Sequence, residues 1–121
     1  LRERGAAAGA AIFARGEGLH AGRNEYYFTC TSGGPAKLGQ IFRLRTPGGG
    51  KADELDLFFE SGDRQLFEYG DNLTIAPNGH LVVCEDRSGE ALNYLRGVTP
   101  GGKVYTIARL HAATELAGAT F

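Results

Sequence analysis

The sequence predicts an all-β protein built from antiparallel strands. Short runs rich in β-branched and aromatic residues alternate with turns that contain glycine, proline and asparagine. Glycine supplies 19 of the 121 residues, and no long segment shows a helical period of apolar residues. The turn sequence TPGG occurs at Thr46 and again at Thr99, 53 positions later, and each copy joins two strand-like runs. Propeller blades repeat at roughly 40–50 residues, so we expect antiparallel blades of a β-propeller, about two to three blades of a six-bladed ring.

The expected strands follow one another between turn signals. The clearest hairpin is centred on Pro77-Asn78-Gly79, because Asn-Gly accepts the positive φ angles of a type I′ turn. The alanine-rich start is interpreted as a loop or short helix, since Glu3 and its weakly apolar residues argue against a signal peptide. The run NYLRGV before the second TPGG is also strand-like. The other expected strands are Tyr26–Thr31, Gln40–Arg45, Leu55–Glu60, Leu73–Ala76, His80–Glu85 and Lys103–Ala108.

The domain organisation expected from this pattern is a fragment, residues 1–121, of one β-propeller domain without an internal boundary. A closed propeller needs about 4–8 blades, more than this length supplies. The chain also begins with Leu1 and contains no methionine, which indicates a processed product or a fragment. A small β-sandwich is the alternative architecture, because Pro-Gly turns occur in many hairpins.

Composition excludes several function classes. The net charge of −1 and the 22% of charged residues give no electrostatic case for nucleic acid or an anionic membrane. No apolar run reaches the roughly 20 residues that span a bilayer. Cys30 and Cys84 lie in apolar strand patterns and are expected to be buried core residues. The three histidines lack the paired spacing of a zinc site.

Polar residues precede two of the apolar runs. Glu17 stands before one, and Asp71 and Asn72 stand before another. In a radially repeated β-protein such positions converge, and calcium takes 6–8 oxygen ligands from separate parts of a chain. Neighbours on a strand point to opposite faces, so one of the pair should reach the centre, and Asn72 is the residue we expect there.

Four other charged residues are interpreted as ordinary surface positions. Glu85 and Asp86 end an apolar run and are expected to form a solvated strand exit. Arg43 and Arg45 alternate along one strand, which is typical of an exposed edge.

The pieces that carry a family resemblance are, in chain order, ARGEG, EYYFTCTSGG, GQIFRLRTPGGG, LFFES, DNLTIAPNGHLVVCED, LRGVTPGGKVYTIAR and ELAGATF. In order and spacing they resemble the PhoX-type alkaline phosphatase family, and the resemblance covers the chain from Phe13 to Phe121. The resemblance implies a six-bladed propeller with calcium and, in PhoX itself, iron in its central channel. It also implies hydrolysis of phosphate monoesters and a periplasmic or secreted location. Similar members usually have proline where Gly70 stands and continue beyond the last phenylalanine with a Ser-Pro-Asp-Gly turn.

The resemblance also assigns roles to individual residues. It implies that Glu17 and Glu115 are metal ligands and that Arg15 holds a phosphate oxygen. The family's iron-binding thiolate lies in an upstream Cys-Glu-Glu segment, so neither cysteine here takes that role. Glu17, Asn72 and Glu115 together supply fewer than the 6–8 oxygens that calcium takes. We therefore expect the isolated chain to bind calcium weakly and to lack useful phosphatase turnover. The remaining blades of the complete protein would be its partners.

The sequence leaves two other functions open. The Glu-Gly pair and the Asn that precedes a Pro-Asn-Gly hairpin also resemble calcium-dependent gluconolactonase-type propellers. In that case Glu17 and Asn72 would bind a calcium ion that activates a lactone, whereas Arg15 favours a phosphate substrate. The third possibility is a non-catalytic scaffold.

Overall fold

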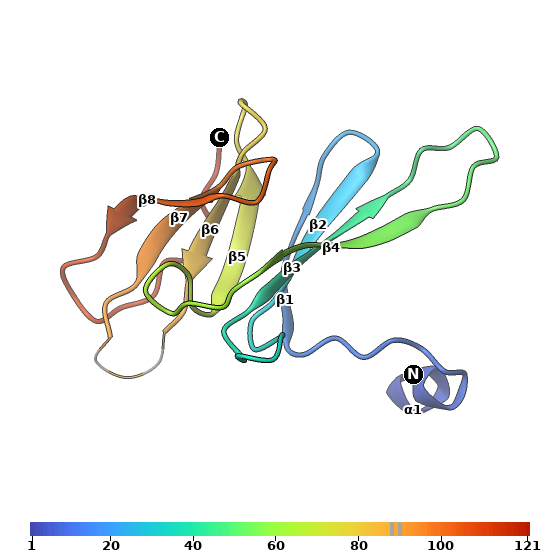
Figure 1. The fold of residues 1–121 in the computed structure, drawn as a ribbon, viewed down its shortest axis with the longest axis horizontal. Helices are drawn as coiled ribbons and strands as arrows, with labels where there is room; N and C mark the ends of the chain where they lie inside the picture. The colour runs from blue at the N-terminus through green and yellow to red at the C-terminus, as the bar shows by residue number, and fades with distance from the viewer. Residues whose placement is uncertain (88, 90) are drawn as a thin grey trace.

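In the part of the chain that the structure describes, the protein folds into two four-stranded antiparallel sheets and one short helix (Figure 1). The computed structural model describes residues 1–87, 89 and 91–121. Each sheet is a meander in chain order, β1-β2-β3-β4 and β5-β6-β7-β8. The elements are α1 (Arg2–Ala7), β1 (Gly16–Ala21), β2 (Glu25–Cys30), β3 (Gln40–Arg45), β4 (Glu54–Glu60), β5 (Gly70–Ile75), β6 (Leu81–Glu85), β7 (Tyr94–Val98) and β8 (Val104–Arg109).

The all-β prediction is confirmed, and the expected strands correspond to β2 through β8. The expected short helix corresponds to α1. One strand, β1, was not among the expected set, because two of its six residues are glycines. The two TPGG turns connect β3 to β4 and β7 to β8, which are the same hairpin in the two meanders. Over the described residues the sheets stay separate and form no closed barrel.

The two sheets share one hydrophobic core. The first sheet contributes Tyr27 and Ile41, and Phe67 enters from the β4–β5 connection. The remaining buried members belong to the second sheet: Leu73, Leu81, Val83 and Val98. The core therefore joins both meanders into one folding unit. Cys30 and Cys84 are both free and buried, as expected.

Strands β1 and β5, the first strands of the two meanders, lie against each other. Gly18 of β1 is so close to β5 that an added Cβ would overlap the carbonyl oxygen of Asp71. The buried Thr29 hydroxyl donates to that same carbonyl at 2.6 Å and accepts the Gly18 N–H at 2.9 Å. Only glycine permits this approach, so the first strands of both sheets meet at the residues that precede their apolar runs.

The face of the first sheet that points away from the core is apolar. Cross-strand pairing places Leu19, Phe28, Phe42 and Leu57 in one row, and the ring of Phe13 contacts both phenylalanines edge-on. A second row runs through Tyr26, Leu44 and Leu55. We call these residues the outer face. Leu19, Leu55 and Leu57 are exposed, which is uncommon for so many large apolar side chains on one surface.

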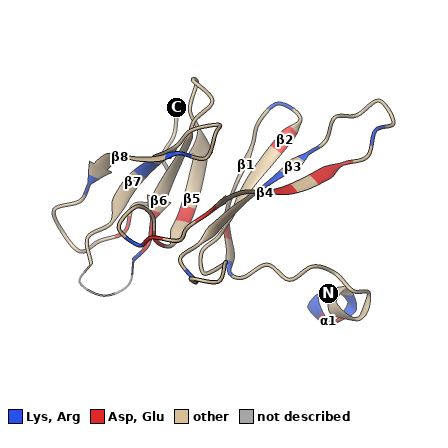
Figure 2. Ribbon diagram, in the orientation of Figure 1, with Lys and Arg blue, Asp and Glu red and all other residues tan. Residues whose placement is uncertain are grey.

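The expectation for the two arginines of β3 was wrong. Strand β3 lies inside the first sheet between β2 and β4, rather than at an edge. Arg43 forms an ion pair with Asp56 of β4 at 2.9 Å, and Arg45 pairs with Glu54 at 2.9 Å. Charged residues of both signs occur on both sheets (Figure 2). No helix among the described residues is long and apolar enough to cross a membrane.

Candidate metal centre

Three carboxylates from separate parts of the chain converge at one point. An oxygen of Asp71, one of Asp86 and one of Glu115 all lie within 4.8 Å of one another. Asp71 belongs to β5, Asp86 directly follows β6, and Glu115 lies in the segment after β8. The two aspartates are half-buried and Glu115 is exposed, so the group opens to solvent on one side.

Matching irregularities in the two sheets place acidic residues here. The β5–β6 pairing shifts register between Gly70 and Leu73, and the β1–β2 pairing shifts at the equivalent place, between Gly16 and Leu19. The first shift spans Asp71 and the second spans Glu17. Such bulges re-aim side chains and are common next to active sites.

Glu17 lies near this group but outside the three carboxylates whose oxygens are within 4.8 Å of one another. Burial, followed by the negative charges of Glu17, Glu115 and Asp86, raises the pKa of Asp71 above its ordinary value. The charge of Glu17 acts on Asp71 because β1 contacts β5 at Gly18, the residue after Glu17. We call Glu17, Asp71, Asp86 and Glu115 the acidic cluster.

Arg15 lies at the margin of the acidic cluster. Its Nη2 is 3.6 Å from Oε1 of Glu17, and both side chains are well exposed. The backbone of Arg15 has φ of 51°, a left-handed conformation that is uncommon outside glycine and is often found at functional sites. Its carbonyl is held by the N–H of Thr31 at 2.9 Å. An exposed guanidinium, paired with Glu17, therefore stands beside the converging carboxylates.

The structure brings most of the expected site residues together. Arg15, Glu17 and Glu115 all belong to this region. Asn72 is exposed on β5 directly after Asp71, and of this pair it is Asp71 whose side chain enters the acidic cluster. Asn72 stays a predicted ligand that the described contacts do not test.

The interpretation of Glu85 and Asp86 as a solvated strand exit was wrong. The Glu85 side chain is wholly buried, and its Oε1 accepts from Nε of Arg96 at 2.9 Å and from the N–H of Glu68 at 3.0 Å. Asp86 is half-buried in the acidic cluster. The available signal was alternation, because Leu81, Val83 and Glu85 lie on the same face of β6.

The donor set fits a hard divalent cation. Carboxylate oxygens are the ligands that calcium and magnesium prefer, and so many like charges in close contact favour either a cation or a proton between them. Both cysteines are buried strand residues and are not part of the cluster. The residues present therefore suit calcium better than a thiolate-bound metal.

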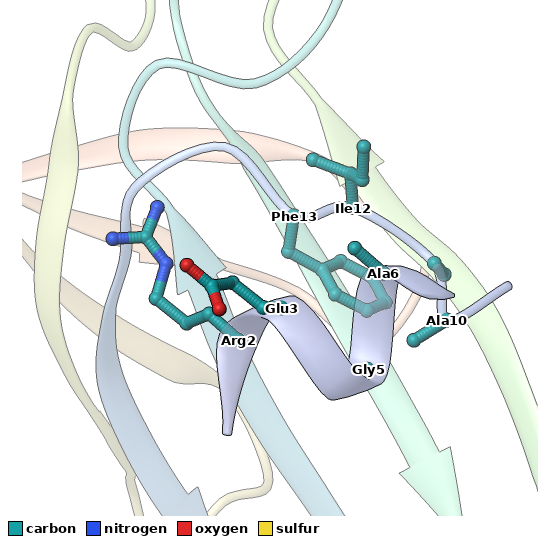
Figure 3. Close-up of a pocket in the computed structure, with 8 residues that line it drawn as sticks. Arg2, Glu3, Gly5, Ala6, Ala10, Ile12 and Phe13 are labelled. Carbon is teal, nitrogen blue, oxygen red and sulfur yellow. The ribbon is translucent and has the colours of Figure 1, made fainter. Parts of the chain in front are cut away.

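A separate pocket of about 660 Å³ lies between α1 and the chain that follows it (Figure 3). Figure 3 shows the ring of Phe13 beside the helix, and Arg2 and Glu3 among the residues that line the pocket. None of the four carboxylates of the acidic cluster lines this pocket. The volume is therefore unconnected with the candidate metal centre.

The raised pKa of Asp71 predicts a pH-dependent stability. The unfolded chain has the lower, ordinary pKa, so between the two values the folded state binds more protons, and this carboxyl destabilises the fold as the pH rises. In metal-free protein, Asp71→Asn should therefore gain thermal stability relative to wild type as the pH increases through that window. Thermal denaturation in EDTA at stepped pH measures the difference. A difference that stays constant with pH would contradict the prediction.

The fold and the acidic cluster define a β-sheet protein with a candidate centre for a hard metal ion beside a cationic side chain. The chain matches the family model described as alkaline phosphatase PhoX over residues 1–120, so it belongs to the alkaline phosphatase PhoX family. Phosphatases of this family are metal-dependent, and their substrates are phosphate esters. No curated protein and no solved structure matches the chain. The family resemblance seen in the sequence is thereby confirmed.

Proposed function

We propose that the chain forms two neighbouring blades of a six-bladed propeller that hydrolyses phosphate monoesters with calcium at its centre. The observation that carries the proposal is the convergence of Asp71, Asp86 and Glu115 from the second meander, with Arg15 and Glu17 at the start of the first meander nearby. The contact between β1 and β5 supports it, because the first strands of neighbouring blades would lie side by side around a channel.

Each residue has a distinct chemical task in this proposal. A bound divalent ion supplies positive charge that neutralises the phosphate and acidifies a water molecule. The carboxylates of the acidic cluster hold that ion. Arg15 donates N–H groups to a phosphate oxygen, and Glu17, at 3.6 Å, keeps the guanidinium beside the ion's ligands. Asn72, adjacent to Asp71, is a further oxygen donor at the channel.

The remaining blades of the complete protein would supply what the chain lacks. Calcium takes 6–8 oxygens, and the outer face needs a covering surface of the kind that another blade presents. Residues 1–121 are then one continuous part of a single propeller domain. An iron ion in the complete channel would need a thiolate from outside these blades. The periplasmic or secreted location of this proposal follows from the resemblance noted in the sequence.

The decisive assay compares the complete protein with the 121-residue chain. We expect the complete protein to hydrolyse p-nitrophenyl phosphate, to lose activity in EDTA and to recover it with calcium. We expect the chain alone to bind calcium more weakly than micromolar and to show no useful turnover, because its oxygen donors are too few. Hydrolysis of a lactone without phosphatase activity would instead support the gluconolactonase type, and absence of both activities would support a scaffold.

A further inference from the structure

A single buried amide connects two of the segments that carry the acidic cluster. Asn93 lies just before β7 and its residue is 3% exposed. Its Oδ1 accepts the backbone N–H of Arg87 at 2.6 Å, and its Nδ2 donates to the carbonyl of Thr114 at 2.9 Å. Arg87 directly follows Asp86, and Thr114 directly precedes Glu115.

The segment with Glu115 depends strongly on this residue. Residues 110–121 contain no strand or helix. Among the described residues, the backbone of this segment makes two hydrogen bonds to the rest of the chain, and both go to Asn93. The Leu110 N–H donates to the Asn93 carbonyl at 3.0 Å, and the Thr114 carbonyl accepts from the Asn93 side chain. Besides these bonds, Leu116–Ala119 face Cys84 and Leu95 across a small pocket. Apolar packing of this kind sets the distance to β6 and β7 but not the position of a particular carboxylate.

The end of β6 is held from the opposite side. The N–H of Asp86 donates to the carbonyl of Tyr69 at 2.9 Å, next to β5. The backbone at Asp86 is therefore held on two sides. Its own N–H is bonded to Tyr69, which directly precedes β5, and the N–H of the next residue, Arg87, is bonded to Asn93. A side chain in this position has to accept from one backbone group and donate to another at the same time. The amide does so with two separate atoms, whereas a serine hydroxyl has one shorter-reaching atom for both tasks, a carboxylate lacks the donor and leucine lacks both groups.

We propose that Asn93 is a positioning residue of the metal centre, which sets the separation of Asp86 and Glu115 without touching the ion. The inference rests on the proposed function. Groups that orient metal ligands typically change metal affinity or activity by about 10–100-fold when they are lost. We expect that loss for calcium binding, together with a lower kcat at limiting calcium that recovers at saturating calcium. The KM for p-nitrophenyl phosphate should be unchanged at saturating calcium, because Arg15 is not displaced.

The experiment compares Asn93→Leu and the milder Asn93→Ser in the complete protein. Calcium affinity is measured by competition with terbium luminescence, alongside kcat, KM and the melting temperature. Asn78→Ala is the matched amide control, because the Asn78 side chain accepts the N–H of His80 within the β5–β6 turn. Ile41→Val, at a buried position of β3, controls for a general loss of stability. Both controls should keep the wild-type calcium affinity.

The outcomes separate this inference from the proposed function. Weaker calcium binding in both Asn93 variants, with kcat restored by excess calcium, supports the positioning role. Wild-type calcium affinity in variants that melt earlier reduces Asn93 to a structural residue and overturns the inference, while the proposed function stands. If the wild-type protein binds no calcium, the proposed function fails and this inference fails with it.

Discussion

Replacement of Glu17 by glutamine in the complete protein is expected to lower metal occupancy and to reduce phosphatase turnover by at least about a hundredfold. The loss of a group that merely orients a ligand already costs about 10–100-fold, and a ligand itself should reach the upper end of that range. Glutamine keeps the size of the side chain but removes the negative charge that offsets the ion. Metal analysis of the purified variant and p-nitrophenyl phosphate kinetics measure both effects.

Arg15→Ala is the matched comparison for this change, because the two side chains are neighbours and the proposed function gives them different tasks. We expect it to retain the wild-type metal content and to weaken phosphate or transition-state binding. A charge-assisted hydrogen bond is worth about 1.5–3 kcal/mol, which corresponds to roughly ten- to a hundredfold. Asn72→Ala tests the remaining predicted ligand in the same way. Wild-type rates in both the Glu17 and the Arg15 variants would leave only the scaffold interpretation.

The fold class was readable from the sequence because its signals are local. Glycine- and proline-containing turns bound each strand, and the repeated TPGG marks the same hairpin in both sheets. Strand β1 was missed because glycine has little strand preference. Gly18 is there for a different reason, the close approach of β5, and that contact joins residues more than 50 positions apart.

The candidate site was only partly readable for a related reason. Glu17 was singled out by its position before an apolar run and then by the family resemblance, and Glu115 by the resemblance alone, whereas Asp86 was interpreted as solvated because it follows the last residue of a strand. Its place in the acidic cluster depends on the bulge in β5 and on the path of residues 110–121, and neither leaves a local pattern. The role proposed for Asn93 could not be predicted from the sequence, since an asparagine before a strand normally indicates a turn.

Replacement of Arg96 by methionine is expected to destabilise the protein by up to about 3–5 kcal/mol, because it removes the closer of two cations that pair with the buried Glu85 and leaves this carboxylate with the longer Arg87 contact. Arg96 is 4% exposed, its Nε donates to Oε1 of Glu85 at 2.9 Å, and its guanidinium stacks 4.0 Å from the ring centre of Tyr94. Arg87 lies 3.2 Å from the other carboxylate oxygen. The positive and negative residues gathered where the β4–β5 connection meets the end of β6 are visible in Figure 2. Chemical denaturation of wild type and variant measures the difference.

Two further variants show whether the cost arises from the buried charge or from lost packing. Glu85→Gln combined with Arg96→Met removes both charges and keeps an acceptor for the N–H of Glu68, so it should recover much of the stability.

Arg43→Met removes a similar ion pair and a similar aromatic contact, with Phe58, from the first sheet. The Arg43 and Asp56 side chains are 25% and 35% exposed, so this change should cost no more than about 1 kcal/mol. Equal losses for Arg96→Met and Arg43→Met would show that burial of Glu85 does not dominate. A double variant no more stable than Arg96→Met would assign the loss to packing against Tyr94.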